Sequence, residues 1–500
     1  MSDLVPLLVA LPVFGSVVAL LAGLARDRVG WPIATLTLLV QTAVAGTLAA
    51  DVLGGEAIQY VVGGFTVPIG IELLVDGLSA SIALLISVVA LGVLAYARRA
   101  GPRSNAFYII YLLLVAGLSG MSITADVFNM YVFLEITGLT AYALVASGDG
   151  GRSAIAALKY LLVGTVGASL FLLGIGFAYI ATGTLNMGDL SSQLAAVGYD
   201  SPLVLAAFGL LVVGLFVKIA VFPLHTWQPA AYAGSPDSVS ALISALVSTV
   251  AAYALIRIVF TVFTVDFLTT TPLARTVLVA GAVVSIVVGS LLAVSQDELK
   301  RMLAYSSVSQ FGLIVGAVAI GNVLALTGAA IHLVGHAIMK GGLFLTVGLV
   351  NEATGARRID EYAGLAKRSP VGAAAFSVLA IAMVGVPPAV GFVGKWYIVL
   401  GAIEAEAWPL AVVIFASTLL TLAYFARVVE RIYFRDPTET TGLAPTATDG
   451  GEDDSSPPEP TVSFGMRATI VAAAIVAVAL GAVAVGYGDM LEPTIEGLLA

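Results

Sequence analysis

Apolar blocks of about twenty residues, separated by short polar segments, recur along almost the whole sequence. A helix needs about 20 apolar residues to cross the hydrocarbon core of a bilayer. Charged residues make up only 11% of the chain, whereas a soluble domain has about 25%. The pattern therefore predicts an all-α integral membrane protein and argues against a soluble enzyme.

Basic residues in the polar segments fix the number of spans. Lys and Arg gather in the cytoplasmic loops of membrane proteins. Basic groups near Arg26, Arg98, Arg152, Lys300 and Arg427 all fall on one side if there are fourteen spans. We therefore expect a multi-pass protein of the cell membrane with both termini outside. The predicted spans are 4–24, 31–51, 73–97, 106–122, 126–147, 154–182, 203–223, 238–264, 272–294, 302–320, 324–350, 370–393, 405–433 and 465–487.

Two of these spans contain breaks. The seventh ends in KIAVFPLHTWQP with Pro223, and the twelfth contains VGVPPAVGFVGKW with Pro387 and Pro388. Proline removes a backbone donor and clashes with the preceding helical turn. The breaks are five spans apart, so two five-helix units around them have opposite orientations. Interrupted helices at matching positions are typical of inverted-repeat transporters with a site at the membrane midplane.

The breaks and the composition together predict how the chain is divided. An acidic stretch, TDGGEDDSSPPEP, has the composition of a disordered linker and leaves the last helix as a peripheral addition. The predicted divisions are 1–105 with helices 1–3, 106–264 with helices 4–8 as the first inverted repeat, 272–435 with helices 9–13 as the second inverted repeat, 436–463 as the linker, and 464–500 with helix 14.

Four ionisable residues lie inside or beside apolar spans: Glu135, Lys218, Lys340 and Lys395. Each charge costs about 2.5–3.5 kcal/mol at a helix centre, so it persists where it pairs, lines water or carries protons. A buried Glu–Lys pair with two arrangements is a proton switch, because a lysine deprived of its carboxylate partner releases its proton. The alternatives are a structural ion pair and a lysine that extends along its helix to the interface.

Three further candidates are the histidines of the chain, His225, His332 and His336. His332, His336 and Lys340 are spaced by four residues and share one helix face. This stripe could be a proton path, because histidine titrates near neutral pH. It could also be structural, with each ring bonded to a neighbouring helix, or a metal pair, although no third ligand is near in the sequence. His225 follows Pro223 and suits either proton transfer or hydrogen bonding at the helix end.

Composition limits the other classes of site. The chain has no cysteine and three histidines, which excludes disulfides and iron–sulfur clusters and argues against haem. We find no P-loop pattern and no catalytic triad, and expect no cofactor and no nucleic acid. Asp76 and Asp126 are expected to cap the helices that follow them, and Arg257 to reach solvent. Acidic loops and a net charge of −9 suggest a halophilic host.

Several motifs resemble one known family over roughly residues 60–435. They are DVFNMYVFLEITGLTAYALVA, ALKYLLVGTVGASLFLLGIGFAYIATGTLN, KIAVFPLHTWQP, SQDELKRMLAYSSVSQFGLI, HLVGHAIMKGGLFL and GVPPAVGFVGKW. They are similar to the antiporter-like membrane subunits of Mrp-type Na⁺/H⁺ antiporters, respiratory complex I and membrane-bound hydrogenases. The segment DVFNMYVFLE and the lysine of GFVGKW are most similar to the D-type branch of the Mrp antiporter subunits.

The resemblance implies about fourteen transmembrane helices with two inverted five-helix repeats, broken helices 7 and 12, and a row of midplane charges. The charged positions of the family fall on Glu135, Lys218, His332, His336, Lys340 and Lys395. The chain departs from the family in helix 8, where a frequent lysine is replaced by Thr249. A hydroxyl cannot store a proton, which puts the link between the two halves in doubt. His225 and Asp237 are the residues that could compensate.

The resemblance also implies a function. We expect a proton-translocating membrane subunit of a multisubunit Na⁺/proton antiporter, a transporter and not itself an enzyme. The implied partners are other membrane subunits, H⁺ and Na⁺, and membrane lipid. One alternative is an antiporter-like subunit of an NADH-quinone oxidoreductase or a membrane-bound hydrogenase, driven by a redox arm. The other is a scaffold subunit that has lost transport, which only Thr249 supports.

Overall fold

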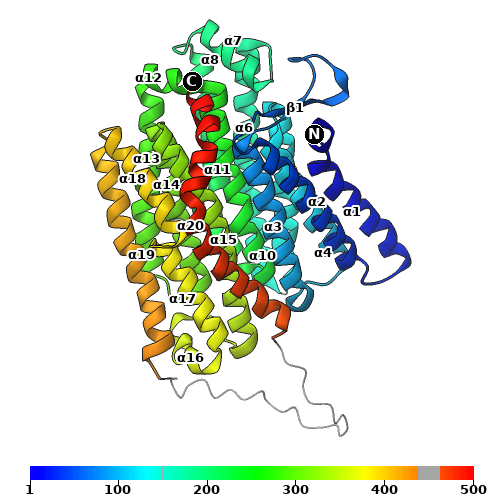
Figure 1. Cartoon of the computed structure of the whole chain (residues 1–500), viewed down its shortest axis with the longest axis vertical. Coiled ribbons are helices and arrows are strands. Elements are labelled where there is room, and N and C mark those ends of the chain that lie inside the picture. Colours follow the sequence, from blue (N-terminus) through cyan, green and yellow to red (C-terminus); the bar gives the residue numbers. More distant parts are fainter. Residues whose placement is uncertain (149, 437–461) are drawn as a thin grey trace.

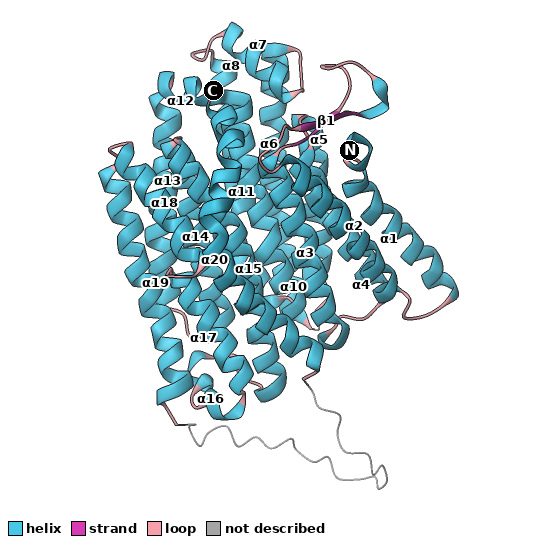
Figure 2. Cartoon of the chain, viewed as in Figure 1, coloured by secondary structure: helices cyan, strands magenta, loops and turns pink. Residues whose placement is uncertain are grey.

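The computed structural model describes residues 1–148, 150–436 and 462–500. Its helices run side by side in one bundle (Figure 1), and the described strands form one small hairpin (Figure 2). The helices are α1 (Leu7–Ala25), α2 (Gly30–Val52), α3 (Gly77–Ala100), α4 (Asn105–Ile123), α5 (Val127–Ala146), α6 (Gly151–Thr182), α7 (Met187–Val197), α8 (Pro202–Ile219), α9 (Gln228–Gly234), α10 (Asp237–Leu242), α11 (Ser248–Arg257), α12 (Thr264–Thr270), α13 (Pro272–Val294), α14 (Leu299–Ile320), α15 (Val323–Thr354), α16 (Leu365–Arg368), α17 (Pro370–Val384), α18 (Val390–Glu404), α19 (Trp408–Phe434) and α20 (Phe464–Leu499).

The predicted all-α membrane fold is confirmed. In the described ranges, thirteen helical segments are long and apolar enough to cross a membrane. The remaining predicted span, the twelfth, consists of α17 and α18, which have 15 residues each and are separated by a short non-helical stretch. The thirteen segments and this broken pair together make up the fourteen predicted spans.

Both predicted breaks are present. Helix α8 ends at Ile219, because Ala220 adopts a left-handed conformation with φ of 70°. The chain then makes a short turn, η3 (Leu224–Trp227), and continues as α9. The second break begins where Gly385 takes φ of 95° at the end of α17. A glycine tolerates this conformation, whereas for Ala220 it costs about 1–3 kcal/mol that the surrounding packing must offset.

The eighth predicted span, 238–264, is called helix 8 and lies at the centre of the molecule. It is distinct from α8, which belongs to the seventh span. Helix 8 joins α10, α11 and α12 through two π-helical segments, η4 (Ile243–Val247) and η5 (Ile258–Phe263). Its most apolar 18 residues are all buried. It packs on α8, α4 and α3 from the first half of the chain and on α14 and α15 from the second. Helix 8 therefore lies between the two halves, which also meet directly where α9 packs on α14 and α3 on α15.

The third predicted span begins later than expected. Residues Glu72–Val75 form strand β2, which pairs antiparallel with β1 (Ile58–Val61), with Ile58 opposite Val75. Helix α3 therefore begins only after Asp76. The short strand β2 could not be distinguished from the start of an apolar helix by the sequence pattern. The polar loop 183–202 likewise contains a helix of its own, α7.

Helix α20, the predicted helix 14, lies on the outside of the bundle, because only 22% of its most apolar stretch is buried. Helix α20 crosses α3, α15, α17 and α18 (Figure 1). At the crossing point, a Cβ atom added to Gly481 would overlap the carbonyl oxygen of Pro388. This helix therefore packs directly on the break of helix 12. Most of the predicted linker 436–463 lies outside the described residues.

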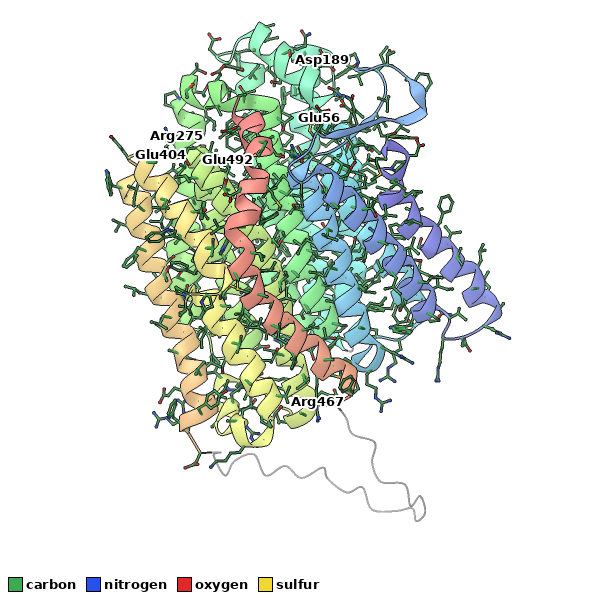
Figure 3. All side chains as sticks on the ribbon, in the orientation of Figure 1. Glu56, Asp189, Arg275, Glu404, Arg467 and Glu492 are labelled. Atoms are coloured by element: carbon green, nitrogen blue, oxygen red, sulfur yellow. The ribbon has the colours of Figure 1, made fainter. Side chains whose placement is uncertain are left out.

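Charged residues lie at both ends of the bundle (Figure 3). Glu56, Asp189, Glu404 and Glu492 lie near the end that carries both termini, and Arg467 lies at the opposite end (Figure 3). Arg275 is a basic residue near the first end (Figure 3).

Candidate functional site

Glu135 and Lys218 form an ion pair between two helices of the first predicted repeat. Glu135 lies in α5 and Lys218 in the last turn of α8, and Oε1 of the glutamate is 3.7 Å from Nζ of the lysine. That distance is too long for a hydrogen bond, although it is close enough for strong attraction where water is excluded. Lys218 has 6% of its side chain exposed and Glu135 has 26%. The carboxylate therefore lies at the edge of the bundle and the ammonium inside it.

The break in helix 7 explains why a lysine is tolerated at this depth. The last carbonyls of a helix carry partial negative charge, and Lys218 belongs to the last turn of α8. Its Nζ also donates to the hydroxyl of Tyr142 at 3.2 Å. A Cβ on Gly138 would be 3.1 Å from Nζ and 3.0 Å from the Tyr142 hydroxyl. The missing side chain at Gly138 lets the ammonium approach α5.

Lys340 lies in a second polar cluster in the other half of the chain. This residue of α15 is fully buried, and its Nζ donates to the carbonyl of Leu303 at 2.9 Å and to Oγ of Ser306 at 2.8 Å. Both acceptors belong to α14. No carboxylate is paired with Lys340 among the described ion pairs. Its proton is held by neutral oxygens alone, which stabilise an ammonium less than a carboxylate does.

The two histidines of α15 continue this cluster. Nε2 of His332 lies 3.0 Å from Oε1 of Gln310, another residue of α14. The rings of His332 and His336 are 6.2 Å apart, and Phe311 meets His336 edge-on at 4.8 Å. Both nitrogens of His336 lack a hydrogen-bond partner among the described residues. The predicted shared face is therefore present, but the three groups are not directly bonded to one another.

Lys395 holds the break of helix 12 together. It lies in α18 and reaches back to α17, where Nζ donates to the carbonyls of Met383 at 2.8 Å and Val384 at 3.0 Å. These are terminal carbonyls of a half-helix, which have no partner within the helix. Lys218 likewise belongs to the last turn of a half-helix, although its Nζ donates to Tyr142 of α5. Half-helix ends of this kind are the places where transporters hold cations.

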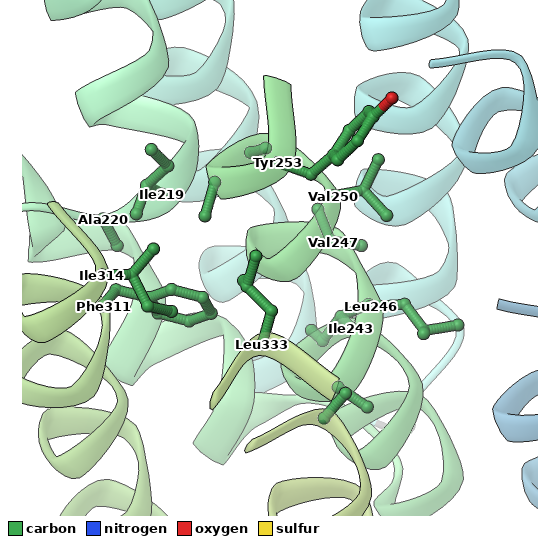
Figure 4. Packing of buried hydrophobic residues seen from close by; sticks show 14 of the residues in the cluster. Ile219, Ala220, Ile243, Leu246, Val247, Val250, Tyr253, Phe311, Ile314 and Leu333 are labelled. Atoms are coloured by element: carbon green, nitrogen blue, oxygen red, sulfur yellow. The ribbon is translucent and has the colours of Figure 1, made fainter. Parts of the chain in front are cut away.

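Apolar side chains separate the two clusters. Ile219, next to Lys218, and Leu333, next to His332, both belong to a buried apolar cluster with Phe311 and Val250 (Figure 4). Thr249 lies in the same helix as Val250, is fully buried, and its Oγ1 has no partner among the described residues. The hydrogen bonds of the described residues provide no continuous chain from Lys218 to Lys340.

His225 is placed in the helix 7 break, as the sequence predicted. Its ring stacks on Phe222 at 5.1 Å and lies 5.9 Å from Tyr305, and Nδ1 has no partner among the described residues. Neither interpretation of His225 is excluded by these contacts. Asp237, the other residue considered as a substitute for a helix 8 lysine, starts α10 and pairs with Lys300 at 2.6 Å.

The expectation that Arg257 reaches solvent is wrong. It is 5% exposed and donates from Nη2 to both carboxylate oxygens of Asp76, at 2.6 and 2.5 Å. Asp76 and Asp126 are N-caps, as predicted. Arg257 also donates from Nε to Tyr253, whose hydroxyl donates to the carbonyl of Ser122. The pair joins helix 8 to α3 across 181 residues of sequence, a distance over which periodicity gives no signal.

Other residues of the site were missed because their roles depend on neighbours. Tyr142 lies seven residues after Glu135 and therefore on the same face of α5, which is the one local signal it offered. Ser306 and Gln310 are likewise four residues apart in α14. Among the described residues, no group of three or more His, Cys, Asp or Glu residues is arranged to hold a metal ion. His332 and His336 thus lack the third ligand that a metal site would need.

Comparisons with known proteins agree on one family. Residues 124–421 match the model for NADH:quinone oxidoreductase/Mrp antiporter transmembrane proteins. NADH-quinone oxidoreductase subunit N of Desulforudis audaxviator is 46% identical over 411 residues, which cover 80% of each chain. The D-type subunit of the Na(+)/H(+) antiporter of Bacillus subtilis is 32% identical over 382 residues, which cover 76% of each chain.

A solved structure is similar over the entire chain. A chain of the Mrp complex from Dietzia sp. DQ12-45-1b superposes with a TM-score of 0.87 and is 27% identical. The alignment covers 100% of both chains. The similarity includes α20 and the N-terminal helices, which lie outside the part matched by the family model.

Proposed function

The chain belongs to the NADH:quinone oxidoreductase/Mrp antiporter transmembrane family, and from that premise we propose that it is a proton-translocating membrane subunit of a multisubunit Na⁺/H⁺ antiporter. The protein is a multi-pass membrane protein. The observation that carries the proposal is the pairing of Lys218, almost fully buried at the end of a half-helix, with Glu135 at 3.7 Å. A lysine in this setting binds or releases a proton when its distance from the carboxylate changes.

The switch works through electrostatics. With the carboxylate of Glu135 close, the ammonium form of Lys218 is stabilised, because opposite charges attract strongly where water is excluded. When the two groups move apart, the buried ammonium loses that stabilisation and desolvation favours the neutral amine. Lysine suits this role because its charge is readily lost on burial, whereas arginine remains charged.

Lys340 and Lys395 extend the proposed path. Both hold their protons against neutral oxygens of serine or of the backbone. Because like charges repel, a proton that arrives on one lysine makes the ammonium form of a neighbouring lysine less favourable. His332 and His336 provide groups beside Lys340 that can take up the released proton. Across the apolar cluster around Thr249, the two halves would be coupled by charge, by movement of helix 8 and by water held at the buried Thr249 hydroxyl, which has no partner among the described residues.

Ions, partners and location follow the antiporter proposal. The relative in Bacillus subtilis is named as a subunit of a Na(+)/H(+) antiporter, which supports Na⁺ as the exchanged cation and other membrane subunits as partners. We further propose that the chain lies in the cell membrane with both termini outside. The concentration of basic residues in the loops on the other side supports this orientation.

A redox-driven pump is the second candidate, and a specific observation favours it. The 46% identical relative is named as a subunit of NADH-quinone oxidoreductase. In that case, the same lysines and glutamate would translocate protons, and the energy would come from electron transfer in partner subunits. The two candidates differ in what drives proton movement: a sodium gradient for the antiporter and an electron donor for the redox pump.

Inside-out membrane vesicles containing the whole complex test the proposal. A pH-sensitive dye would report proton release from acid-loaded vesicles on addition of Na⁺, and acidification of vesicles on addition of NADH. We expect Glu135→Gln and Lys218→Ala to lower the Na⁺-driven rate roughly 10²-fold, as for loss of a proton-transfer group. Glu492→Gln, which changes an exposed glutamate of α20, is the matched control.

The amount of chain assembled into the complex is measured for each variant. Normal Na⁺-driven exchange by both Glu135→Gln and Lys218→Ala would contradict the proposed switch. Proton uptake driven by NADH and not by Na⁺, lost in the same two variants, would favour the redox candidate instead.

A further inference from the structure

A cavity of about 640 Å³ opens at the end of the bundle opposite both termini. Its walls come from both halves of the chain and include four basic side chains, from Arg103, Arg152, Lys300 and Arg357, and two carboxylates, from Asp237 and Glu298. The cavity lies between the start of helix 8 and the start of α14. Asp237, at the beginning of the central helix, forms part of the cavity wall.

The two carboxylates of the cavity are each held by a base. Asp237 Oδ1 is 2.6 Å from Nζ of Lys300, and Glu298 Oε1 is 2.5 Å from Nη2 of Arg152. A metal cation entering the cavity would therefore meet an excess of positive charge and no unpaired carboxylate. Protons do not need such ligands, because they move along hydrogen bonds between water, hydroxyl and titratable groups. The cavity is suited to protons more than to Na⁺.

Lys300 connects the cavity to helix 8. Besides Asp237, its Nζ donates to Oγ of Ser240 and to the carbonyl of Ser235, both at 3.0 Å. The side chain of Lys300 is only 13% exposed, so the ammonium lies at the inner wall of the cavity. Ser240 is itself fully buried. The ion pair therefore marks the boundary between the water-filled space and the protein interior.

Buried serines continue from this boundary along helix 8. Ser240, Ser244 and Ser248 follow at intervals of four residues, which keeps them near one face of the helix, and all three are fully buried. Ser244 lies in the π-helical segment η4, and successive hydroxyls roughly one turn apart are within reach of a single bridging water molecule. Tyr232 contacts both ends of this serine row: its carbonyl accepts a hydrogen bond from Ser240, and its hydroxyl oxygen lies 3.4 Å from Oγ of Ser248.

The serine row ends beside Lys218. Oγ of Ser248 donates to the carbonyl of Lys218 at 3.4 Å, and Nε2 of Gln228 lies 3.4 Å from the same Oγ. Oε1 of Gln228 is buried and has no partner among the described residues. Buried polar atoms without a protein partner are usually bonded to water. The polar groups here thus reach the backbone of Lys218, whose side chain carries the proposed switch.

We propose that the Asp237–Lys300 pair is the proton entry point on the cavity side, and that Ser240, Ser244, Tyr232 and Ser248 conduct protons from it to Lys218. A proton from cavity water first binds the carboxylate of Asp237, and Lys300 loses its counter-charge. The ammonium of Lys300 then gives one proton to the hydroxyl oxygen of Ser240 while that hydroxyl passes its own proton on toward Ser244, and the resulting amine takes the proton of the Asp237 carboxylic acid. The ion pair is restored and one proton has moved inward.

This inference rests on the proposed function, and Asp237→Asn tests it in the intact complex. We expect the proton exchange rate in inside-out vesicles to fall roughly tenfold or more, because the group that accepts the entering proton is lost. Glu298→Gln is the control, since it breaks the other ion pair of the cavity. The double variant Asp237→Asn with Lys300→Met removes both charges, so that a loss of activity there is not due to an unpaired buried ammonium.

A second pair of variants tests the serine row. Ser248→Ala should lower the exchange rate several-fold, whereas Ser290→Ala should leave it unchanged. Ser290 is equally buried and bonds to Ser309 at 2.8 Å in a different part of the bundle. Assembly of the complex is measured for all variants, so that a folding defect is separated from a defect in proton movement.

The absence of cysteine from the chain allows a direct test of access. Asp237→Cys in inside-out vesicles should react with a membrane-impermeant thiosulfonate that carries a carboxylate, and the added carboxylate should restore part of the lost rate. Unmodified wild-type vesicles control for cysteines of partner subunits. Normal rates in Asp237→Asn and Ser248→Ala, with exchange still lost in Glu135→Gln, would overturn this inference alone. No proton movement in the wild type under either driving force would overturn the proposed function.

Discussion

Nζ of Lys395 lies 2.8 Å from the carbonyl oxygen of Met383, and this hydrogen bond crosses the break in helix 12. The lysine thus has two separable tasks. It satisfies backbone carbonyls that the interrupted helix leaves unpaired, and it can hold a proton at the end of the proposed path. The two tasks make different demands on the side chain, because the first needs a donor and the second needs a donor that can release its proton.

Lys395→Arg separates these tasks. Arginine keeps hydrogen-bond donors for the carbonyls of Met383 and Val384 but does not lose its proton in proteins. We expect the complex to assemble normally while proton exchange in vesicles falls roughly 10²-fold. Lys395→Met should in addition reduce the amount of assembled complex, because it leaves two buried carbonyls without a partner. Full exchange activity in Lys395→Arg would assign Lys395 a purely structural role.

Tyr142→Phe tests the hydroxyl that accepts from Lys218 at 3.2 Å. Without it, the ammonium loses one acceptor whether Glu135 is close or distant, so the proton should be released more readily in both arrangements. We expect exchange to slow several-fold and its pH dependence to shift. Tyr111→Phe is the control, because that buried hydroxyl donates to the carbonyl of Ala90, away from the charged residues. Equal behaviour of the two variants would show that Tyr142 has no specific role.

Much of the architecture is predictable because its signals are local. Hydrophobic blocks, loop charges and the prolines of the breaks all act within about twenty residues. The positions of Glu135 and Lys218 are predictable for the same reason, since a charge in an apolar block is conspicuous. The Asp76–Arg257 pair, the packing of α20 and the polar partners of Lys340 join segments far apart in sequence. Their formation depends on helix packing, which hydropathy does not encode.

Arg257→Leu should destabilise the complex strongly. It leaves the carboxylate of Asp76 buried and unpaired, and breaking a buried ion pair in this way costs about 3–5 kcal/mol. Adding Asp76→Asn should recover much of the loss, because the unpaired charge is removed and asparagine still caps α3. Thermal unfolding of the solubilised complex measures both effects. Asp126→Asn, at the N-cap of α5, is the control, and a similar loss in that variant would contradict the importance of the ion pair.

The same pair gives a pH prediction. Burial acts to raise the pKa of Asp76, but the charge of Arg257 and the hydrogen bonds from Arg257 and Ser79 together hold the pKa below its ordinary value of 3.8. A carboxyl with a lowered pKa stabilises the fold above its unfolded pKa and loses that effect as the pH falls through its folded pKa. The stability difference between wild type and the double variant should stay constant from about pH 7 to 5 and decline only below 3.8.

Thr249→Val tests whether the coupling of proton movement between the two halves of the chain passes through helix 8. The hydroxyl of Thr249 is buried and has no partner among the described residues, so its removal should not lower thermal stability. We expect exchange to slow several-fold nonetheless, because the hydroxyl is a polar anchor for water in the apolar cluster of Figure 4. Unchanged exchange would indicate that the halves are coupled by charge and movement alone.

Gly481→Ala tests whether α20 supports the break of helix 12. The added Cβ atom would overlap the carbonyl oxygen of Pro388, so α20 or the break must move. Overpacking of this kind costs about 1–3 kcal/mol, and we expect both a lower melting temperature and slower exchange, because Lys395 follows the break directly. Gly486→Ala is the matched control in the same helix, since its added Cβ would meet no atom within 4 Å. Equal melting temperatures and exchange rates in the two variants would show that α20 only covers the bundle. A loss of stability and exchange confined to Gly481→Ala would show that α20 supports the position of Lys395.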